Sequence, residues 1–297
     1  MTQETPIDKA AAHGGTEHHH RLRVKIPKAA LSEETANHLR ALDGFRVVAD
    51  GHVFRSVRYH EVSAHCLKME HVRGSVVSDI LSQSGSRWAS AKRLASAQKL
   101  VHLAGCWLGY FHKWRPSQRA SHYDLHVLAQ RAIDQVDVLR NGGLPSNLAD
   151  RLIDTIEQAI PGEVGDRVVS VHGDFKPGNL MISGHEVIGI DMEGYGWGSP
   201  LTDLGSFIAS TAVLRSAHRF RGVSLGHRRL LCREFLGAYR SVTEWDIQGL
   251  PLQVLKSIVF LCGYMTRHQN PLLWWLRGRP TMVQTISEAL DHPFVEE

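Results

Sequence analysis

The sequence of 297 residues predicts an α+β fold with a small β-rich N-terminal lobe and a larger, mostly helical C-terminal lobe. Short runs in which apolar and polar residues alternate, as in strands, crowd the first third of the chain. Later stretches carry apolar residues at the spacing of an amphipathic helix. With 43% hydrophobic and 22% charged residues, the composition is that of an ordinary globular protein.

The change of pattern divides the chain into three parts. Residues 1–19 are polar and mixed in charge, and we expect a flexible segment that is not a signal peptide. Residues 20–73 would form the N-terminal lobe and residues 74–297 the C-terminal lobe. The longest apolar stretch, residues 258–265, is too short to cross a bilayer, which takes about 20 residues.

The N-terminal lobe is expected to be a small sheet that carries one helix. Residues 21–26 alternate as in a half-buried strand, and Ser32 is a suitable N-cap for a helix over residues 32–42. The pair Asp50-Gly51 is typical of a turn between two hairpin strands. Three further strands are expected over residues 45–49, 52–59 and 65–70.

The C-terminal lobe combines long helices with one group of short strands. Helices are expected over residues 89–114, 124–140 and 148–159, and again over most of the chain from residue 203 onward. The short strands are expected over residues 167–171, 180–182 and 187–190.

The loops beside those strands carry the residues with the clearest chemical meaning. The first loop lies in the segment V-H-G-D-F-K-P-G-N-L-M-I and offers Asp174, Lys176 and Asn179 within a few positions. The second lies in G-I-D-M-E, where Asp191 and Glu193 follow an apolar strand. Two related strand ends can hold these side chains around one small volume.

This set of side chains suits phosphoryl transfer. Phosphoryl transfer needs a carboxylate that accepts the proton of the acceptor hydroxyl and oxygen ligands for Mg²⁺, and the set Asp174, Asn179 and Asp191 could supply these groups. Lys176 could place positive charge beside the transferred phosphate. Structural alternatives are open for single residues, since Asp174 could form an Asx-turn and Asn179 could cap the following strand.

The pattern H-G-D-x-K-x-x-N followed by I-D-x-E resembles the aminoglycoside phosphotransferase and choline kinase superfamily of small-molecule kinases. The resemblance implies a protein-kinase-like fold, with Asp174 as catalytic base and Asn179 and Asp191 as ligands of Mg²⁺. Glu193 matches a second acidic residue that these kinases often carry, with an exposed acid as the alternative. His172 would orient the catalytic loop through hydrogen bonds.

Three further segments extend the resemblance. The stretch L-K-M-E-H-V-R-G, which contains Glu70 and Val72, is similar to the family's strand and hinge, where backbone groups meet the adenine. His112 ends a long helix where the family commonly has a histidine. The segment P-L-T-D-L matches the family's P-x-x-D-L, although its Asp203 could also cap a helix.

The part of the N-terminal lobe that would cover the phosphates departs from the kinase pattern. No G-x-G-x-x-G precedes the first strand, so the lobe could be shortened. Lys25 is the candidate for pairing with the phosphates, and Glu34 on the next helix is its expected partner. Lys28 and Glu33 are the rival choices, and a surface lysine beside a capping glutamate is the structural alternative.

The pattern favours a small-molecule acceptor over a protein. The span from Asp191 to Asp203 leaves almost no room for a protein-kinase activation segment. Gly173 also replaces the arginine that would bind a phosphorylated activation loop.

Two groups of residues near the C-terminus bear on the acceptor. The first group could favour an anionic acceptor, with a solvated loop as the alternative. The second could contact a sugar ring or a membrane surface, with core packing as the alternative. The first group is His218, Arg219, Arg221, His227, Arg228 and Arg229, and the second is Trp274, Trp275, Arg277 and Arg279.

We therefore expect an ATP- and Mg²⁺-dependent O-phosphotransferase that transfers phosphate in line to a small hydroxylated molecule, with a sugar or glycoconjugate intermediate as one candidate. A pseudokinase that binds or scaffolds without nucleotide is the alternative. The net charge of +4 is too small to imply nucleic-acid binding. Four scattered cysteines without C-x-x-C spacing fit a reducing cytoplasm.

Overall fold

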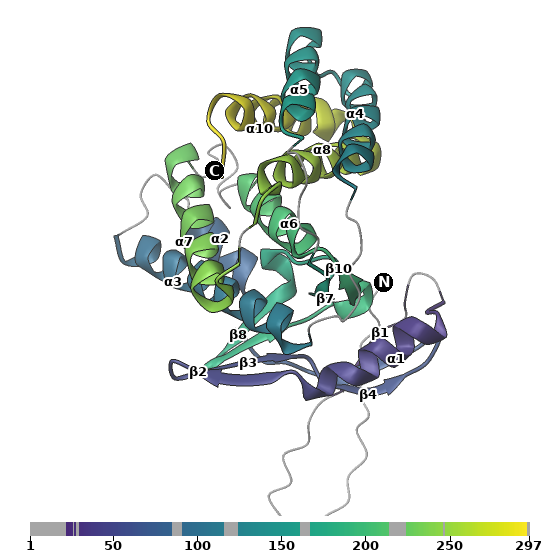
Figure 1. Ribbon diagram of the computed structural model, residues 1–297, viewed down its shortest axis with the longest axis vertical. Helices are drawn as coiled ribbons and strands as arrows, with labels where there is room; N and C mark the ends of the chain where they lie inside the picture. The colour runs from purple at the N-terminus through teal and green to yellow at the C-terminus, as the bar shows by residue number, and fades with distance from the viewer. Residues whose placement is uncertain are drawn as a thin grey trace, which may run out of the picture.

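The computed structural model describes residues 22–25, 27, 30–84, 91–115, 124–160, 167–213, 224–245 and 247–295. The predicted α+β fold is confirmed: strands from the N-terminal part gather at one end of the molecule, and helices make up most of the rest (Figure 1). The segment 1–19 lies outside the described residues. No helix of the described ranges is both long enough and apolar enough to cross a membrane.

The N-terminal strands belong to two sheets. The first sheet is antiparallel, in the order β1 (Leu22–Lys25), β5 (Leu67–Glu70) and β4 (Tyr59–Val62). The second sheet has the order β2 (Arg46–Ala49), β3 (His52–Ser56), β9 (Glu186–Gly189), β8 (Leu180–Ser183) and β6 (Ser75–Val76). Because β3 pairs in parallel with β9, an N-terminal strand lies directly beside the strand that leads to Asp191.

The single strand predicted over residues 52–59 is two strands in the structure. β3 and β4 are separated at Val57 and Arg58, because β3 pairs with β2 and β9 while β4 pairs with β5. The N–H of Val57 donates to the carbonyl of Gly189 at 2.8 Å, which keeps the crossing bonded to the second sheet. The predicted turn between β2 and β3 has positive φ at Asp50 (50°) and Gly51 (73°), as a tight hairpin turn requires.

Helix α1 (Glu33–Ala41) follows β1 and begins where the sequence predicts. The Oγ of Ser32 accepts a hydrogen bond from the N–H of Thr35 at 3.1 Å, which is the expected N-cap. Ala36 and Leu39 are buried on the inner face of the helix. A 3₁₀ turn over Leu42–Gly44 then leads into β2.

The C-terminal lobe is built from helices around one short antiparallel pair of strands. The helices are α2 (Val77–Ser84), α3 (Ala91–Trp114), α4 (Leu125–Asn141), α5 (Ser146–Gln158), α6 (Pro200–Ala212), α7 (Leu225–Thr243), α8 (Leu250–His268), α9 (Pro271–Leu273) and α10 (Arg279–Asp291). The π-helical turn η4 (Trp274–Gly278) joins α9 to α10. The paired strands are β7 (Val169–Val171) and β10 (Gly196–Gly198). Two short 3₁₀ turns lie between them in the sequence, η2 (Pro177–Asn179) and η3 (Met192–Gly194).

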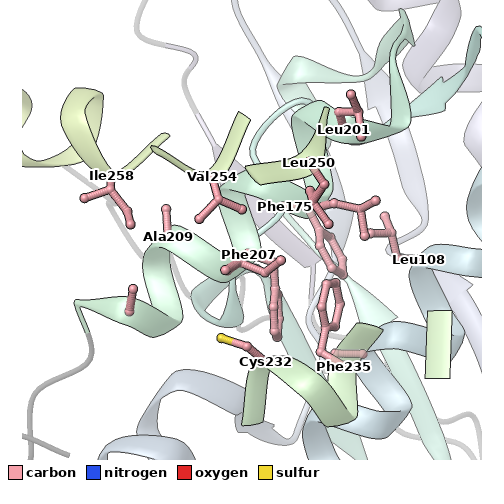
Figure 2. Close-up of a cluster of buried hydrophobic side chains, with 14 of the residues drawn as sticks. Leu108, Phe175, Leu201, Phe207, Ala209, Cys232, Phe235, Leu250, Val254 and Ile258 are labelled. Atoms are coloured by element: carbon pink, nitrogen blue, oxygen red, sulfur yellow. The ribbon is translucent and has the colours of Figure 1, made fainter. Parts of the chain in front are cut away.

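A stack of aromatic rings runs through the core of this lobe. The rings of Phe207 and Phe235 lie 4.0 Å apart between centroids, and Phe175 lies 5.5 Å from Phe207 (Figure 2). Trp107 on α3 continues the stack, 5.3 Å from Phe175 and almost parallel to it. Because Phe175 directly follows Asp174, burial of this ring holds the loop that carries the predicted base.

Candidate active site

Asp203, in the first turn of α6, holds the backbone of the loop that follows β7. Its fully buried carboxylate accepts the N–H of His172 at 2.6 Å and the N–H of Gly173 at 2.9 Å. His112, near the end of α3, places its Nε2 3.2 Å from the same carboxylate and its Nδ1 3.0 Å from the hydroxyl of Tyr239. These donors offset the cost of burying the carboxylate, so the loop is tied to both helices.

Asp203 is not the N-cap of α6, which was the structural alternative for this residue. The cap is Ser199, whose Oγ accepts the N–H of Leu201 at 3.3 Å. The carboxylate of Asp203 is therefore committed to the loop of His172 and Gly173.

Gly173 has a backbone conformation that few other residues adopt. Its φ is +82°, and an added Cβ would lie 2.2 Å from the carbonyl oxygen of Gly194. The loop and the turn after Asp191 thus approach each other more closely than a side chain at Gly173 would allow.

His172 is fully buried and is bonded on both ring nitrogens. Its Nε2 lies 3.0 Å from the carbonyl oxygen of Ile190, which can only accept, so Nε2 carries the proton. Its Nδ1 lies 3.4 Å from the N–H of Asp174. Burial lowers the pKa of His172 below its usual 6.5, although the charge of Asp203 opposes this. A neutral ring in this position links the two loops through hydrogen bonds, and its role in orienting the catalytic loop stays a prediction.

The structure brings Asp174, Lys176 and Asn179 together. Lys176 forms an ion pair with the carboxylate of Asp174. The Nδ2 of Asn179 donates to the backbone oxygen of Asp174 at 2.8 Å and to its Oδ2 at 3.1 Å. Asn179 is buried, whereas the side chains of Asp174 and Lys176 are 46% and 41% exposed. The carboxylate of Asp174 is thus held on one side and open to solvent on the other.

Asp191 lies beside this group and pairs with the N-terminal lobe. The N–H of Ile190 donates to the carbonyl of Asn179 at 2.9 Å, which joins the two acidic loops through the backbone. The left-handed backbone of Asp191, with φ 60°, turns the chain from β9 into η3. Its carboxylate forms an ion pair with Lys25, which also pairs with Glu193 at 2.9 Å.

The charges of this cluster stabilise one another. Burial lowers the pKa of Lys25, but its contacts with the two carboxylates more than offset this, so the pKa lies above 10.5. Burial raises the pKa of Asp191, and its contact with Lys25 more than offsets this, so the pKa lies below 3.8. Lys25 therefore stays a cation and Asp191 an anion at neutral pH.

The sequence-based partner of Lys25 is not its partner in the structure. Glu34 is exposed in the first turn of α1, and the ion pairs of Lys25 within the described residues are with Asp191 and Glu193. The physical reason is that the inner face of the helix carries Ala36 and Leu39 instead of an acid. The rival Lys28 lies outside the described residues.

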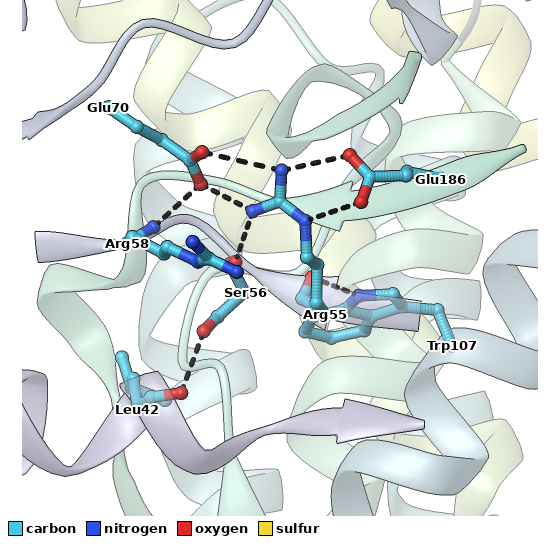
Figure 3. Close-up of polar contacts among 7 residues, drawn as sticks. All are labelled: Leu42, Arg55, Ser56, Arg58, Glu70, Trp107 and Glu186. Carbon is cyan, nitrogen blue, oxygen red and sulfur yellow. Dashed lines mark hydrogen bonds and ion pairs between the residues drawn. The ribbon is translucent and has the colours of Figure 1, made fainter. Parts of the chain in front are cut away.

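Arg55, on β3, is a buried cation that sequence reasoning missed. Its guanidinium pairs with Glu70 on β5 and contacts Glu186 on β9 through Nε at 3.1 Å and Nη2 at 3.0 Å (Figure 3). The N–H of Arg58 also donates to Glu70, at 2.9 Å. An arginine inside the apolar strand V-F-R-S is the signal that could have revealed this network.

This network limits what the predicted hinge residues can offer a nucleotide. The carboxylate of Glu70 is committed to Arg55 and Arg58. Val72 is half-buried against the core. The backbone N–H of Glu70 is engaged as well, since it donates to the carbonyl of Arg58 at 3.0 Å.

The two groups near the C-terminus have different surroundings. Arg228 is buried, donates to the carbonyl of Ala212 and pairs with Glu288, so it serves helix packing. Trp274 is buried and Trp275 is exposed, so core packing, the structural alternative for this group, applies to Trp274 and not to Trp275. Three members of the basic group lie outside the described residues: His218, Arg219 and Arg221.

The oxygen donors beside Lys25 fit a magnesium ion. Asp191 and Glu193 offer carboxylate oxygens, and Asn179 offers its amide oxygen because its Nδ2 is committed to Asp174. Hard oxygen donors are what Mg²⁺ prefers, together with phosphate oxygens and water. Among the described residues no group of three or more His, Cys, Asp and Glu side chains is arranged for a metal.

A β-rich lobe on a helical lobe, with an H-G-D loop facing an acidic turn, defines the class of small-molecule kinases with a protein-kinase-like fold. The profile of the phosphotransferase enzyme family (APH) matches residues 13–236, and the chain belongs to this family, as the sequence resemblance predicts. No curated protein sequence matches the chain.

Solved structures of small-molecule kinases share the fold. A candidate aminoglycoside phosphotransferase from Ralstonia eutropha JMP134 has a TM-score of 0.60 and 19% identity, over 91% of this chain and 86% of its own. Glucosamine kinase in complex with glucosamine, ADP and inorganic phosphate has a TM-score of 0.59 and 15% identity, over 91% and 71%. Choline kinase from Cryptosporidium parvum Iowa II has a TM-score of 0.57 and 12% identity, over 94% and 86%. At these identities the likeness establishes the fold.

Proposed function

We propose that the protein is an ATP- and Mg²⁺-dependent O-phosphotransferase that transfers the terminal phosphate directly to a hydroxyl of a small molecule. The observation that carries the proposal is the meeting of Asp174, Asn179 and Asp191 on two hydrogen-bonded loops. A scaffold without catalysis has no physical need for all three groups in one place.

Each residue of the catalytic loop has its own task in this mechanism. Asp174 accepts the proton of the acceptor hydroxyl as the hydroxyl oxygen attacks the terminal phosphorus, while the bond from that phosphorus to the bridging oxygen breaks and ADP leaves. Asn179 holds the carboxylate of Asp174 in place. Lys176 adds positive charge beside the reacting groups. Asn179 and Asp191, with Glu193 beside them, would hold a Mg²⁺ ion, which would supply charge neutralisation on the phosphate oxygens.

We assign the nucleotide to the residues of the N-terminal lobe that the sequence already indicates. Lys25 forms ion pairs with the acidic turn and would exchange its carboxylate partners for phosphate oxygens. The hinge backbone at Glu70 and Val72 would contact the adenine. The glucosamine kinase that shares this fold was solved with ADP, which supports a nucleotide here.

The acceptor is proposed to be a small hydroxylated molecule, with a sugar or glycoconjugate intermediate as the first candidate. Only η3 and β10 separate Asp191 from α6, so no peptide platform lies between them. Trp197 on β10 is exposed and could stack on a sugar ring. The free state of all four cysteines fits a reducing cytoplasm as the site of action.

A pseudokinase is the second candidate, and one observation favours it. Lys25 is engaged by Asp191 and Glu193 rather than by a helix glutamate, so the phosphate-binding lysine of an active kinase lacks its usual support. Such a protein would keep the fold and bind partners without nucleotide.

Thermal unfolding with ATP or GTP, with and without Mg²⁺, separates the two candidates. A ligand at 100 times its Kd stabilises a native binder by about 2.7 kcal/mol, which is a measurable shift. We expect a Mg²⁺-dependent shift that Asp191→Ala abolishes. Asp174→Asn should keep the shift but lose phosphate transfer to a panel of sugars and amino alcohols by roughly 10²- to 10⁴-fold. No shift with either nucleotide would overturn the kinase proposal in favour of the pseudokinase.

A further inference from the structure

Exposed apolar side chains concentrate at one place on the molecule. Of the five consecutive residues 272–276, four are 50% to 66% exposed, and the fifth, Trp274, is buried. Tyr264, late in the preceding helix α8, is 59% exposed. We call the set Tyr264, Leu272, Leu273, Trp275 and Leu276 the α8–α10 patch. A monomeric protein rarely leaves a large apolar patch in water without a use for it.

The other exposed large apolar side chains of the described residues do not gather in this way. Apart from Phe260 on α8, they are spread over β1, β2, α4, β10 and α7: Leu22, Val48, Val127, Trp197 and Leu230. The helices α4, α5, α8 and α10 lie at the end of the molecule opposite β2, β3 and β4 (Figure 1). The patch is therefore on the helical end and away from the N-terminal sheets.

The turn that carries the patch is firmly anchored. The indole N–H of Trp274 donates to the carbonyl of Gly142 at 3.0 Å, and Nε of Arg279 donates to the carbonyl of Gly143 at 2.9 Å. Gly278 packs so tightly on Trp274 that an added Cβ would lie 2.1 Å from its ring. Because Trp274 takes the inward position of the π-helical turn, its apolar neighbours are held outward by the fold itself.

The same stretch of chain is basic. The sequence has no Asp or Glu from residue 247 to residue 287, but it has Lys256, Arg267, Arg277 and Arg279. The guanidinium of Arg279 lies 4.6 Å from the ring centre of Trp275, so a cation sits on the exposed indole. The apolar surface is thus edged by positive charge.

Several acids on neighbouring elements are engaged with other residues. Asp137 on α4 and Asp150 on α5 both pair with Arg140. Asp134 on α4 accepts a hydrogen bond from Gln130 at 2.9 Å. Glu288, the first acid after the basic stretch, pairs with Arg228.

We propose that the α8–α10 patch docks the protein on a membrane surface that contains anionic lipids. Leucine and tryptophan side chains on an anchored turn can enter the boundary between headgroups and acyl chains. Arginines at its edge attract anionic headgroups. Apolar area and positive charge act together on a bilayer, and either alone binds weakly.

The charge of the patch argues against a second copy of this chain as the occupant. A two-fold interface would place the patch on itself. Arg279, which lies over Trp275, would then face its own copy, and the stretch from residue 247 to residue 287 supplies no acid between them. A bilayer with anionic headgroups has no such conflict.

Flotation of the full chain with lipid vesicles tests the proposal. The vesicles would be phosphatidylcholine alone, or roughly three parts phosphatidylcholine to one part phosphatidylglycerol. Wild type should float with the anionic vesicles, much less with the neutral ones, and less as salt screens the charges. The double variant Trp275→Ser/Leu276→Ser should lower the partition coefficient at least about tenfold.

The matched control is the double variant Val48→Ser/Leu230→Ser, which removes exposed apolar side chains outside the patch. It should float like wild type, and both doubles should keep the wild-type unfolding midpoint. The proposal is overturned if wild type stays with the soluble fraction or if both doubles float equally. It is also overturned if the patch variant instead splits a wild-type dimer on gel filtration, which would assign the patch to self-association.

Discussion

The Oδ2 atom of Asp203 lies 2.6 Å from the backbone nitrogen of His172, and this bond spans 31 positions of the sequence. The other carboxylate oxygen takes the N–H of Gly173, and the buried His112 approaches from α3. One carboxylate therefore joins α3, α6 and the loop of Asp174. The position of the proposed base depends on this contact more than on the local sequence around it.

Asp203→Asn should destabilise the protein and disturb the loop. The amide keeps the shape but turns one acceptor into a donor that faces backbone N–H groups, and hydrogen bonds to a charged group contribute about 1.5 to 3 kcal/mol each. We expect a loss of roughly 3 kcal/mol in the free energy of unfolding, measured by urea denaturation.

Asp124→Asn is the matched control for that change. Asp124 also accepts two backbone N–H groups, those of His126 and Val127, but it does so at the exposed N-terminus of α4. Asparagine caps a helix about as well as aspartate, so the free energy of unfolding should change little. Equal losses in the two variants would show that Asp203 is not the anchor of the loop.

Gly173→Ala should cost far more than Gly184→Ala. Both glycines have positive φ, +82° and +61°, so alanine strains the backbone by about 1 kcal/mol at either one. Only at Gly173 would the new Cβ meet another atom, the carbonyl oxygen of Gly194 at 2.2 Å, while nothing lies within 4 Å at Gly184. Unfolding midpoints of the two variants measure the difference. A similar midpoint for both would mean that the close approach of the two loops is unimportant.

The helices and most strands could be predicted from the sequence because their signals are local. Ser32 caps α1 as expected, and the positive φ values at Asp50 and Gly51 suit the predicted turn. The division of residues 52–59 into β3 and β4 could not be predicted, because it follows from the pairing of β3 with a strand more than a hundred residues later. No local pattern reports a partner at that distance.

The residues that share the first loop of the candidate site could be predicted for the same reason, but the ion pair between that site and the N-terminal lobe could not. Asp174 and Asn179 are close in sequence and share one loop, so their spacing already brings them together. The partner of Lys25 is set by the packing of β1 against the acidic turn, which joins residues 166 positions apart. A nearby glutamate was the natural expectation, and the tertiary fold placed Asp191 there instead.

Arg55→Lys should weaken the contact between the hinge strand and β9. Lysine keeps the charge but cannot offer the planar fork that meets Glu70 and Glu186 together. We expect a loss of about 2 kcal/mol in the free energy of unfolding. Arg58→Lys, at an exposed position next to the same carboxylate, should change it by less than about 0.5 kcal/mol. If both variants lose the same stability, the fork has no special role.

Glu186 gives this network a dependence on pH whose sign can be stated. The hydrogen bond from Arg55 holds the pKa of Glu186 below its usual 4.5, although partial burial opposes this. The folded-state pKa is therefore the lower one. The contact stabilises the fold at pH values above 4.5, and this contribution is lost as the pH falls through the folded-state pKa.

The free energy of unfolding of wild type and Glu186→Gln, measured in urea from pH 7 down to about pH 3, tests this sign. The variant should be less stable at neutral pH, and the difference should shrink once the pH is below 4.5. In an Arg55→Met background most of that pH dependence should vanish, because the main cause of the pKa shift is gone. A difference that stays constant with pH, or that grows as the pH falls, would show that Glu186 is not stabilised as an anion by Arg55.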